Sequence, residues 1–110
     1  MYAIEESVQK INGEVVVTFQ REICDGNTNL VIEAGTTGYK GGCCRNAGGR
    51  TYISLLCLNG DFFFGPIKDD EGRFAGITIA CCGDEGLNAI MKALEFCQQA
   101  INDQRCDVDD

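Results

Sequence analysis

The residues of this chain that could bind an anion gather in one stretch, residues 35–50, whose sequence is GTTGYKGGCCRNAGGR. Six of the fourteen glycines and three of the nine lysines and arginines lie in this stretch, which contains no acid, whereas the whole chain has a net charge of −8. Glycine lets backbone N–H groups surround an anion, and lysine and arginine add charge and further donors. The sequence therefore predicts an anion-binding loop in an acidic protein.

The ligand expected for this loop is an anionic or nucleotide-like small molecule. Hydroxyls, one aromatic ring, backbone amides and cations are expected to contact it, from Thr36, Thr37, Tyr39, Lys40, Gly41, Gly42, Arg45 and Arg50. The pattern is neither a Walker A loop nor a dinucleotide fingerprint, because Gly-Lys-Ser/Thr is absent and no helix is expected to follow. So long a connection is unusual in a compact domain, and the alternative interpretation is a mobile loop or a subunit contact.

Two adjacent cysteines of the same loop, Cys43 and Cys44, are candidates for reactive thiols. Cations flank them in the sequence, and nearby cations favour the thiolate. A metal site would need a second pair such as Cys81–Cys82, but the usual Cys-x2-Cys spacing is absent and adjacent strand residues point to opposite faces. We expect no metal and no cofactor, and mainly reduced thiols that pack as small apolar groups. A cysteine-based redox or metal-binding protein is a second alternative.

The 110 residues include no histidine. Its absence excludes Ser-His-Asp and Cys-His catalysis, histidine metal sites and the commonest general base at neutral pH. Carboxylates are plentiful, but a pair such as Asp69–Asp70 is expected in a solvated turn, where burial does not separate the pKa values of the two groups. We therefore predict a non-enzymatic binding module with no catalytic residue.

The acidic balance gives an alternative function. Most of the seventeen acids lie in residues 61–110, and such a surface could dock on a basic partner as an interaction or inhibitor factor. The same charge argues against binding of nucleic acid or anionic membranes. The longest uncharged stretch, residues 51–60, is half the length of a membrane span, and acids occupy the N-terminus where a signal peptide has cations. We expect a soluble, cytoplasmic protein.

We expect a short helix and two strands before the loop in the sequence, and two further strands directly after it. Ile4, Val8 and Ile11 recur at helical spacing, which predicts a short N-terminal helix. Alternating apolar residues predict strands at residues 14–24 and 30–34, joined as a hairpin by turn residues. Residues 51–58 and the segment ending near Pro66 form the next two strands, joined by Asn59–Gly60 in a type I′ hairpin that sets Leu58 opposite Asp61.

A fifth strand is predicted at residues 73–82, followed by one long helix from Gly83. A single apolar stripe runs along this helix, from Leu87, Ile90, Met91, Leu94, Cys97 and Ile101. The fold class is therefore α+β, with a five-stranded antiparallel meander and a long C-terminal helix packed on one face, in a single domain of residues 1–110. The uncovered face would carry Leu56, Leu58 and Phe63, which predicts a homodimer through that face.

Overall fold

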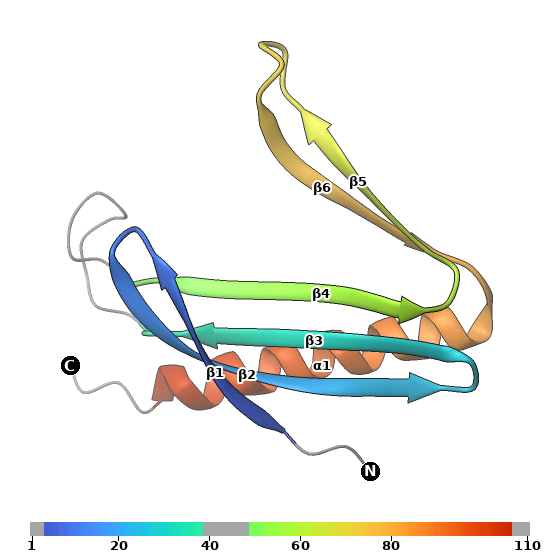
Figure 1. Cartoon of the computed structure of the whole chain (residues 1–110), viewed down its shortest axis with the longest axis horizontal. Coiled ribbons are helices and arrows are strands. Elements are labelled where there is room, and N and C mark those ends of the chain that lie inside the picture. Colours follow the sequence, from blue (N-terminus) through green and yellow to red (C-terminus); the bar gives the residue numbers. More distant parts are fainter. Residues whose placement is uncertain (1–3, 39–48, 107–110) are drawn as a thin grey trace.

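The computed structural model describes residues 4–38 and 49–106 of the chain (Figure 1). Within them the elements are β1 (Glu5–Ile11), β2 (Glu14–Asp25), β3 (Thr28–Thr36), β4 (Thr51–Asn59), β5 (Phe62–Lys68), β6 (Phe74–Cys81) and α1 (Gly83–Cys106). The first four strands form an antiparallel sheet in the order β1-β2-β3-β4, and β5 pairs with β6 in a separate two-stranded sheet. The predicted α+β class, with one long C-terminal helix packed on an antiparallel sheet, is confirmed.

The predicted N-terminal helix is wrong, because residues 5–11 form strand β1. Asn12 and Gly13 both have positive φ, at 49° and 84°, and they join β1 to β2 with Ile11 opposite Glu14. This is the backbone geometry of a two-residue type I′ hairpin turn. The turn and the valine-rich partner strand β2 outweigh the weak helical spacing of three apolar residues.

The next two pairings bring the ends of the predicted binding loop together. β2 and β3 form the predicted hairpin, and β3 then pairs with β4 across residues 37–50. Thr36 lies opposite Thr51 at the end of this ladder. The loop therefore starts and finishes at neighbouring positions on one edge of the molecule.

The predicted pairing of β4 with β5 is also wrong. A type I′ turn needs positive φ at both residues, but only Gly60 has it, at 133°. Asn59 stays in the β3–β4 ladder opposite Asn29, and its side-chain amide donates to the Asn27 carbonyl at 2.7 Å. Beyond it the chain leaves the sheet, and Phe62 packs against the hydrophobic core.

β5 and β6 form a hairpin that projects from the corner of the four-stranded sheet (Figure 1). We call residues 62–81 the arm. Only its base, at Phe62 and Cys81, lies against the start of α1, where a Cβ on Gly86 would meet both side chains within 4 Å. Pro66 is tolerated inside β5 because the strand has an unpaired edge.

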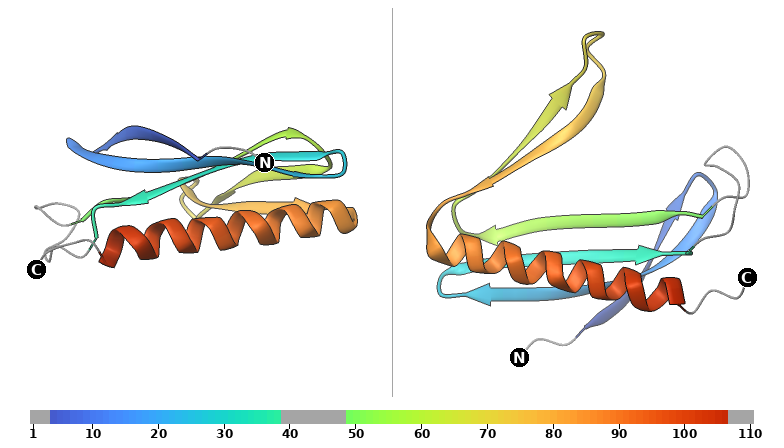
Figure 2. Two further views of the ribbon diagram at one scale, coloured as in Figure 1. Left: turned by 90° about the horizontal axis from the view of Figure 1, so that it is seen from below. Right: turned by 180° about the vertical axis from the view of Figure 1, so that it is seen from behind.

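Helix α1 packs on β3 and β2 with its small residues (Figure 2, left). The side chains facing the sheet are Ala89, Ala93, Cys97 and Ala100, which are at most 8% exposed. They pack against Ile23, Leu30, Ile32 and Ala34 to form the core. The predicted stripe is thus only partly buried: Leu87, Met91 and Leu94 are 54–60% exposed. Small residues allow the helix axis to approach the strands closely, and this decides which face is buried.

The opposite face of the sheet is partly covered by the chain itself. Val16 and Thr18 are fully buried. The Glu33 carboxylate accepts hydrogen bonds from the Thr18 hydroxyl at 2.5 Å and from the Gln9 side chain of β1 at 2.8 Å. The large apolar surface predicted for this face is therefore reduced to Leu56 and Leu58, since Phe63 lies on the arm.

The molecule is flat and open, with extents of 42 × 41 × 17 Å. Its accessible surface is 7498 Å², whereas a compact monomer of 11.9 kDa exposes about 5,900 Å². The projecting arm accounts for the open outline. Within the residues described, no helix has the length and apolar character needed to span a membrane.

Candidate functional site

The ends of the predicted binding loop are joined by a network of hydrogen bonds, at residues 36–38 and 49–51, which we call the neck. Thr37 N donates to the Arg50 carbonyl at 2.9 Å, and Arg50 N donates to the Thr37 hydroxyl at 2.8 Å. The Thr36 hydroxyl is 2.9 Å from that of Thr51 and accepts from Gly38 N at 3.0 Å. The Gln104 side chain of α1 accepts from Thr36 N at 3.0 Å. Both threonine hydroxyls therefore have partners inside the neck.

Arg50 is a buried part of the same neck. Its side chain is 6% exposed overall, and Nε donates to the Ile11 carbonyl at the end of β1, at 3.0 Å. The guanidinium thus fixes the β1–β2 turn to the base of the loop. The other predicted contacts and thiols lie outside the described residues: Tyr39, Lys40, Gly41, Gly42, Cys43, Cys44 and Arg45. Their role in binding stays a prediction.

A groove of about 900 Å³ runs between α1 and β2. Phe19, Ile23 and Phe96 line its apolar floor, and charged side chains such as Arg21 and Glu95 stand at its rim. At one end Lys92 forms an ion pair with Asp25 across the groove, at 3.5 Å. The groove has the shape of a docking site.

The most exposed apolar surface of the described chain is on the arm. Phe64 lies opposite Ile79 and Pro66 opposite Ile77, so these four residues share one face with Phe62 and Cys81 at the base. We call this the inner face. The Phe62 and Phe64 rings stack with centroids 6.0 Å apart. Ile77 and Ile79 are 63% and 43% exposed, and the face continues the core beyond the sheet.

A second set of exposed apolar side chains lies on α1 and β4. We call it the ledge, and its members are Ile53, Leu87, Met91 and Leu94, each 54–60% exposed. The helix packs on β3 and β2 but not over β4, so the helix-facing side of β4 is left open beside these side chains (Figure 2, right). Leu87 is four residues into α1, close to the base of the arm, whereas Ile53 lies near the start of β4, toward the neck.

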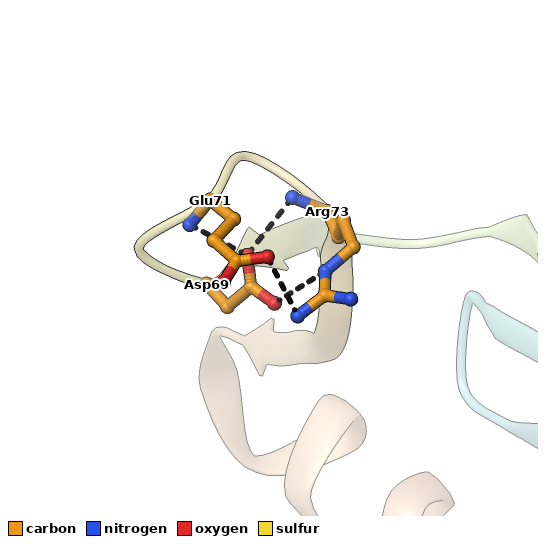
Figure 3. A network of polar contacts seen from close by, with 3 residues as sticks. All are labelled: Asp69, Glu71 and Arg73. Atoms are coloured by element: carbon orange, nitrogen blue, oxygen red, sulfur yellow. Dashed lines mark hydrogen bonds and ion pairs between the residues drawn. The ribbon is translucent and has the colours of Figure 1, made fainter.

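The tip of the arm is polar, and the carboxylates of Asp69 and Glu71 both contact Arg73 there (Figure 3). Asp69 Oδ1 accepts from Glu71 N at 2.9 Å and from Arg73 N at 3.0 Å, and Oδ2 pairs with Arg73 Nε at 3.2 Å. The Arg73 backbone N–H, followed by that of Glu71 and the Arg73 side chain, lowers the pKa of Asp69 below its ordinary 3.8. The predicted solvated turn at Asp69–Asp70 is present, and these contacts hold its shape.

The thiols of the described residues give no sign of chemistry. Cys97 is buried in the core, and desolvation raises the pKa of its thiol, which keeps it neutral. Cys81 and Cys82 lie at the base of the arm, and no group of three metal-ligating side chains occurs in residues 4–38 and 49–106. The metal alternative gains no support from this part of the chain.

Comparison of the chain with protein-family models, with curated proteins and with solved structures gives no match. Function must therefore be inferred from the surfaces themselves.

Sequence reasoning missed the two apolar surfaces, although each had a signal. The helix carries alanine or cysteine at positions 89, 93, 97 and 100, a small-residue stripe that competes with the larger apolar stripe for the sheet. The arm carries apolar residues on both faces of two strands. A hairpin with two apolar faces exposes at least one of them to solvent unless another element or another chain covers it.

Proposed function

We propose that the protein is a non-enzymatic binding module that acts through protein–protein contact at the inner face of the arm and the ledge. The observation that carries this proposal is the exposure of the inner face: Ile77 and Ile79 are 63% and 43% exposed on a hairpin that, among the described residues, lies against the rest of the chain at its base. Contiguous exposed apolar surface of this kind marks interaction sites.

Energetics support the same function. Burying a large apolar side chain is worth about 1.5–3 kcal/mol, and an isolated two-stranded hairpin is marginal in water. The arm and the ledge together expose nine such side chains: Ile53, Phe63, Ile67, Phe74, Ile77, Ile79, Leu87, Met91 and Leu94. A partner that covers them would stabilise both the hairpin and the complex.

The proposal is tested by cross-linking of lysine residues in an extract of the cells that make the protein. Lys68 lies in the arm with its amine 5.2 Å from the centre of the Phe74 ring, and Lys92 lies on α1. We expect Lys68 to form cross-links to another polypeptide, which are lost in a variant with Ile77→Ser and Ile79→Ser. The matched control is Thr78→Ser, on the other face of the same strand. Cross-links that survive the double substitution would contradict the proposal.

A second candidate function is the binding of an anionic or nucleotide-like small molecule by residues 35–50. The segregation of charge favours it, since three cations and no acid occur in this segment of a chain with net charge −8. The hydrogen-bonded neck holds the two ends of the segment together, which would limit the entropy that ligand binding costs.

Thermal shift with a panel of nucleotides tests this candidate. A ligand at a hundred times its dissociation constant adds about 2.7 kcal/mol to the free energy of unfolding. The increase should disappear in a variant with Lys40→Ala and Arg45→Ala and remain with Lys68→Ala, which removes a cation from the arm. If no anion raises the melting temperature of the wild-type chain, this candidate is wrong.

A further inference from the structure

We propose that the partner is a second copy of this chain, and that two copies exchange their arms. Each arm would lie along the outer edge of β4 of the other copy, with its inner face on that copy's ledge. The inference rests on the proposed function and names the partner of the same surfaces. The arrangement is two-fold and reciprocal, so that both copies make the same two contacts.

The outer edge of β4 is the first observation. β4 is the last strand of the four-stranded sheet, so the backbone groups on its outer side have no strand partner. It has nine residues, and the two strands of the arm have seven and eight. An edge of this length pairs readily with a further strand, and natural proteins cover or block such edges. The arm matches the edge in length.

The ledge is the second observation, because it lies on the β4 side of the helix. The opposite flank of α1 faces β2, where Asn88 and Lys92 bind Asp25 at 3.4 and 3.5 Å. Leu87 and Leu94 are seven residues apart and lie together on the other flank, whereas Met91 is two residues from both Ala89 and Ala93 and so points away from the sheet. A hairpin added to β4 would therefore lie beside Leu87 and Leu94, and its inner face would cover them.

The arm of the same copy is directed away from this place. Only two residues join β4 to β5, and Cys82 alone joins β6 to α1. Cys82 N donates to the Asp61 carbonyl at 3.2 Å and closes the base of the arm, while the Asn59 side chain is bound to the β2–β3 turn. Short, pinned connections of this kind favour exchange of an element between copies over its closure within one copy.

The amount of surface fits this partner. The chain exposes about 1,600 Å² more than a compact monomer of its mass. A standard interface buries about 800 Å² from each partner. The excess surface of one copy is thus large enough for a stable contact, and exchange lets one hairpin cover both apolar surfaces at once.

The effect of salt on affinity distinguishes a second copy from a basic protein partner. Each copy has a net charge of −8, so two copies repel each other through solvent. Added salt screens this repulsion, and the dimer should therefore tighten as salt rises. A complex with a basic partner should weaken under the same change.

Sedimentation equilibrium on the full chain tests the inference. We expect the wild type to have twice the 11.9-kDa mass of one chain, and Ile77→Asp on the inner face and Leu94→Asp on the ledge each to be monomeric. Thr78→Asp, on the other face of the arm, should remain dimeric. Circular dichroism of the two monomeric variants should keep the wild-type content of helix and strand, because both positions are exposed in one copy.

Mixing the two monomeric variants gives the sharpest outcome. In a mixed pair, the unaltered arm of Leu94→Asp meets the unaltered ledge of Ile77→Asp, so one of the two contacts is restored. A mixed dimer that is weaker than the wild type but present is the expected result. Arms that packed on arms, or ledges on ledges, would not be rescued by mixing, and a mixture that stays monomeric would overturn the exchange.

Three further outcomes would each overturn one part of the inference. A wild type that is monomeric at all concentrations, while Lys68 still cross-links to another protein, overturns the second copy as partner and leaves the proposed function standing. A dimer that neither Ile77→Asp nor Leu94→Asp weakens overturns the exchange. A dimer that loosens with added salt contradicts the charge argument.

Discussion

At the scale of single residues, Arg50 ties three parts of the chain together. Its backbone closes the neck of the loop with Thr37, and its buried side chain donates to the carbonyl of Ile11 at the end of β1. The cluster of cations in residues 35–50 predicts a ligand contact at Arg50. In the structure its guanidinium is buried and donates to the Ile11 carbonyl instead. An arginine's type alone therefore does not separate a binding role from a structural one.

Replacing Arg50 should destabilise the fold. Arg50→Ala leaves a carbonyl without its donor, and the loss of such a bond costs about 1–3 kcal/mol of the free energy of unfolding. Arg73→Ala is the control, because the ion pairs that it removes, with Asp69 and Glu71, lie at the exposed tip of the arm, where ion pairs contribute little to stability. Urea denaturation at one protein concentration measures both. Equal losses would contradict a structural role for Arg50.

Asp69 offers a test of the arm tip by pH. Hydrogen bonds from the Arg73 and Glu71 backbones favour its charged form, so its pKa in the folded chain is below the ordinary 3.8. A lowered pKa means that the contribution to stability is fully present above pH 3.8 and is lost as the pH falls through the folded value. An NMR titration of the Asp69 side chain should give a midpoint below the ordinary 3.8. A midpoint at or above 3.8 would show that the network is not formed.

At the scale of elements, two Asn-Gly pairs adopt different backbone structures. Asn59–Gly60 has the stronger setting by sequence, between two long apolar segments, yet Asn59 stays in the β3–β4 ladder. Asn12–Gly13 takes the hairpin geometry instead. The alternation of β2, β3 and β4 and the helix could be predicted from the sequence, because periodicity and turn residues are local signals. The choice between two similar turns could not, because it depends on what the following strand packs against.

The β1–β2 turn should be sensitive to a side chain at Gly13. Its φ is 84°, a region in which L-residues cost about 1–2 kcal/mol. Gly13→Ala should therefore lower the free energy of unfolding by that amount. Gly76→Ala is the control, because Gly76 has no positive φ and its Cβ would meet Ile67 at 3.5 Å, an ordinary contact. Chemical denaturation measures the free energy of unfolding of both variants. A larger decrease for Gly76→Ala than for Gly13→Ala would contradict the turn geometry.

The helix should tolerate large residues on its exposed side and reject them on its packed side. Ala93 is fully buried against the sheet, and Ala93→Leu should destabilise the chain by about 1–3 kcal/mol through overpacking. Gln99→Leu, at an exposed position of the same helix, should change the free energy of unfolding by less than about 0.5 kcal/mol. If Ala93→Leu stabilised the chain, the large apolar stripe would be the packed one.

At the scale of the whole molecule, the open shape is the feature that the sequence hides most completely. Apolar periodicity indicates that a residue faces a neighbour, but it does not say whether the neighbour belongs to the same chain. The predicted five-stranded meander placed β5 against β4 of one copy, and the structure leaves that edge open. The sequence likewise predicts a site at its one basic segment, because clustered charge is visible in a sequence and an unpartnered apolar surface is not.

Hydrogen exchange of the wild-type chain at low and high protein concentration tests the central claim, that the arm and the ledge are covered in solution. The backbone amides of the arm, of the outer edge of β4 and of Leu87 to Leu94 should exchange more slowly as the concentration rises. Those of β2 and β3, which pair within one copy, should not change. Arm amides that exchange without protection at every concentration would contradict the account.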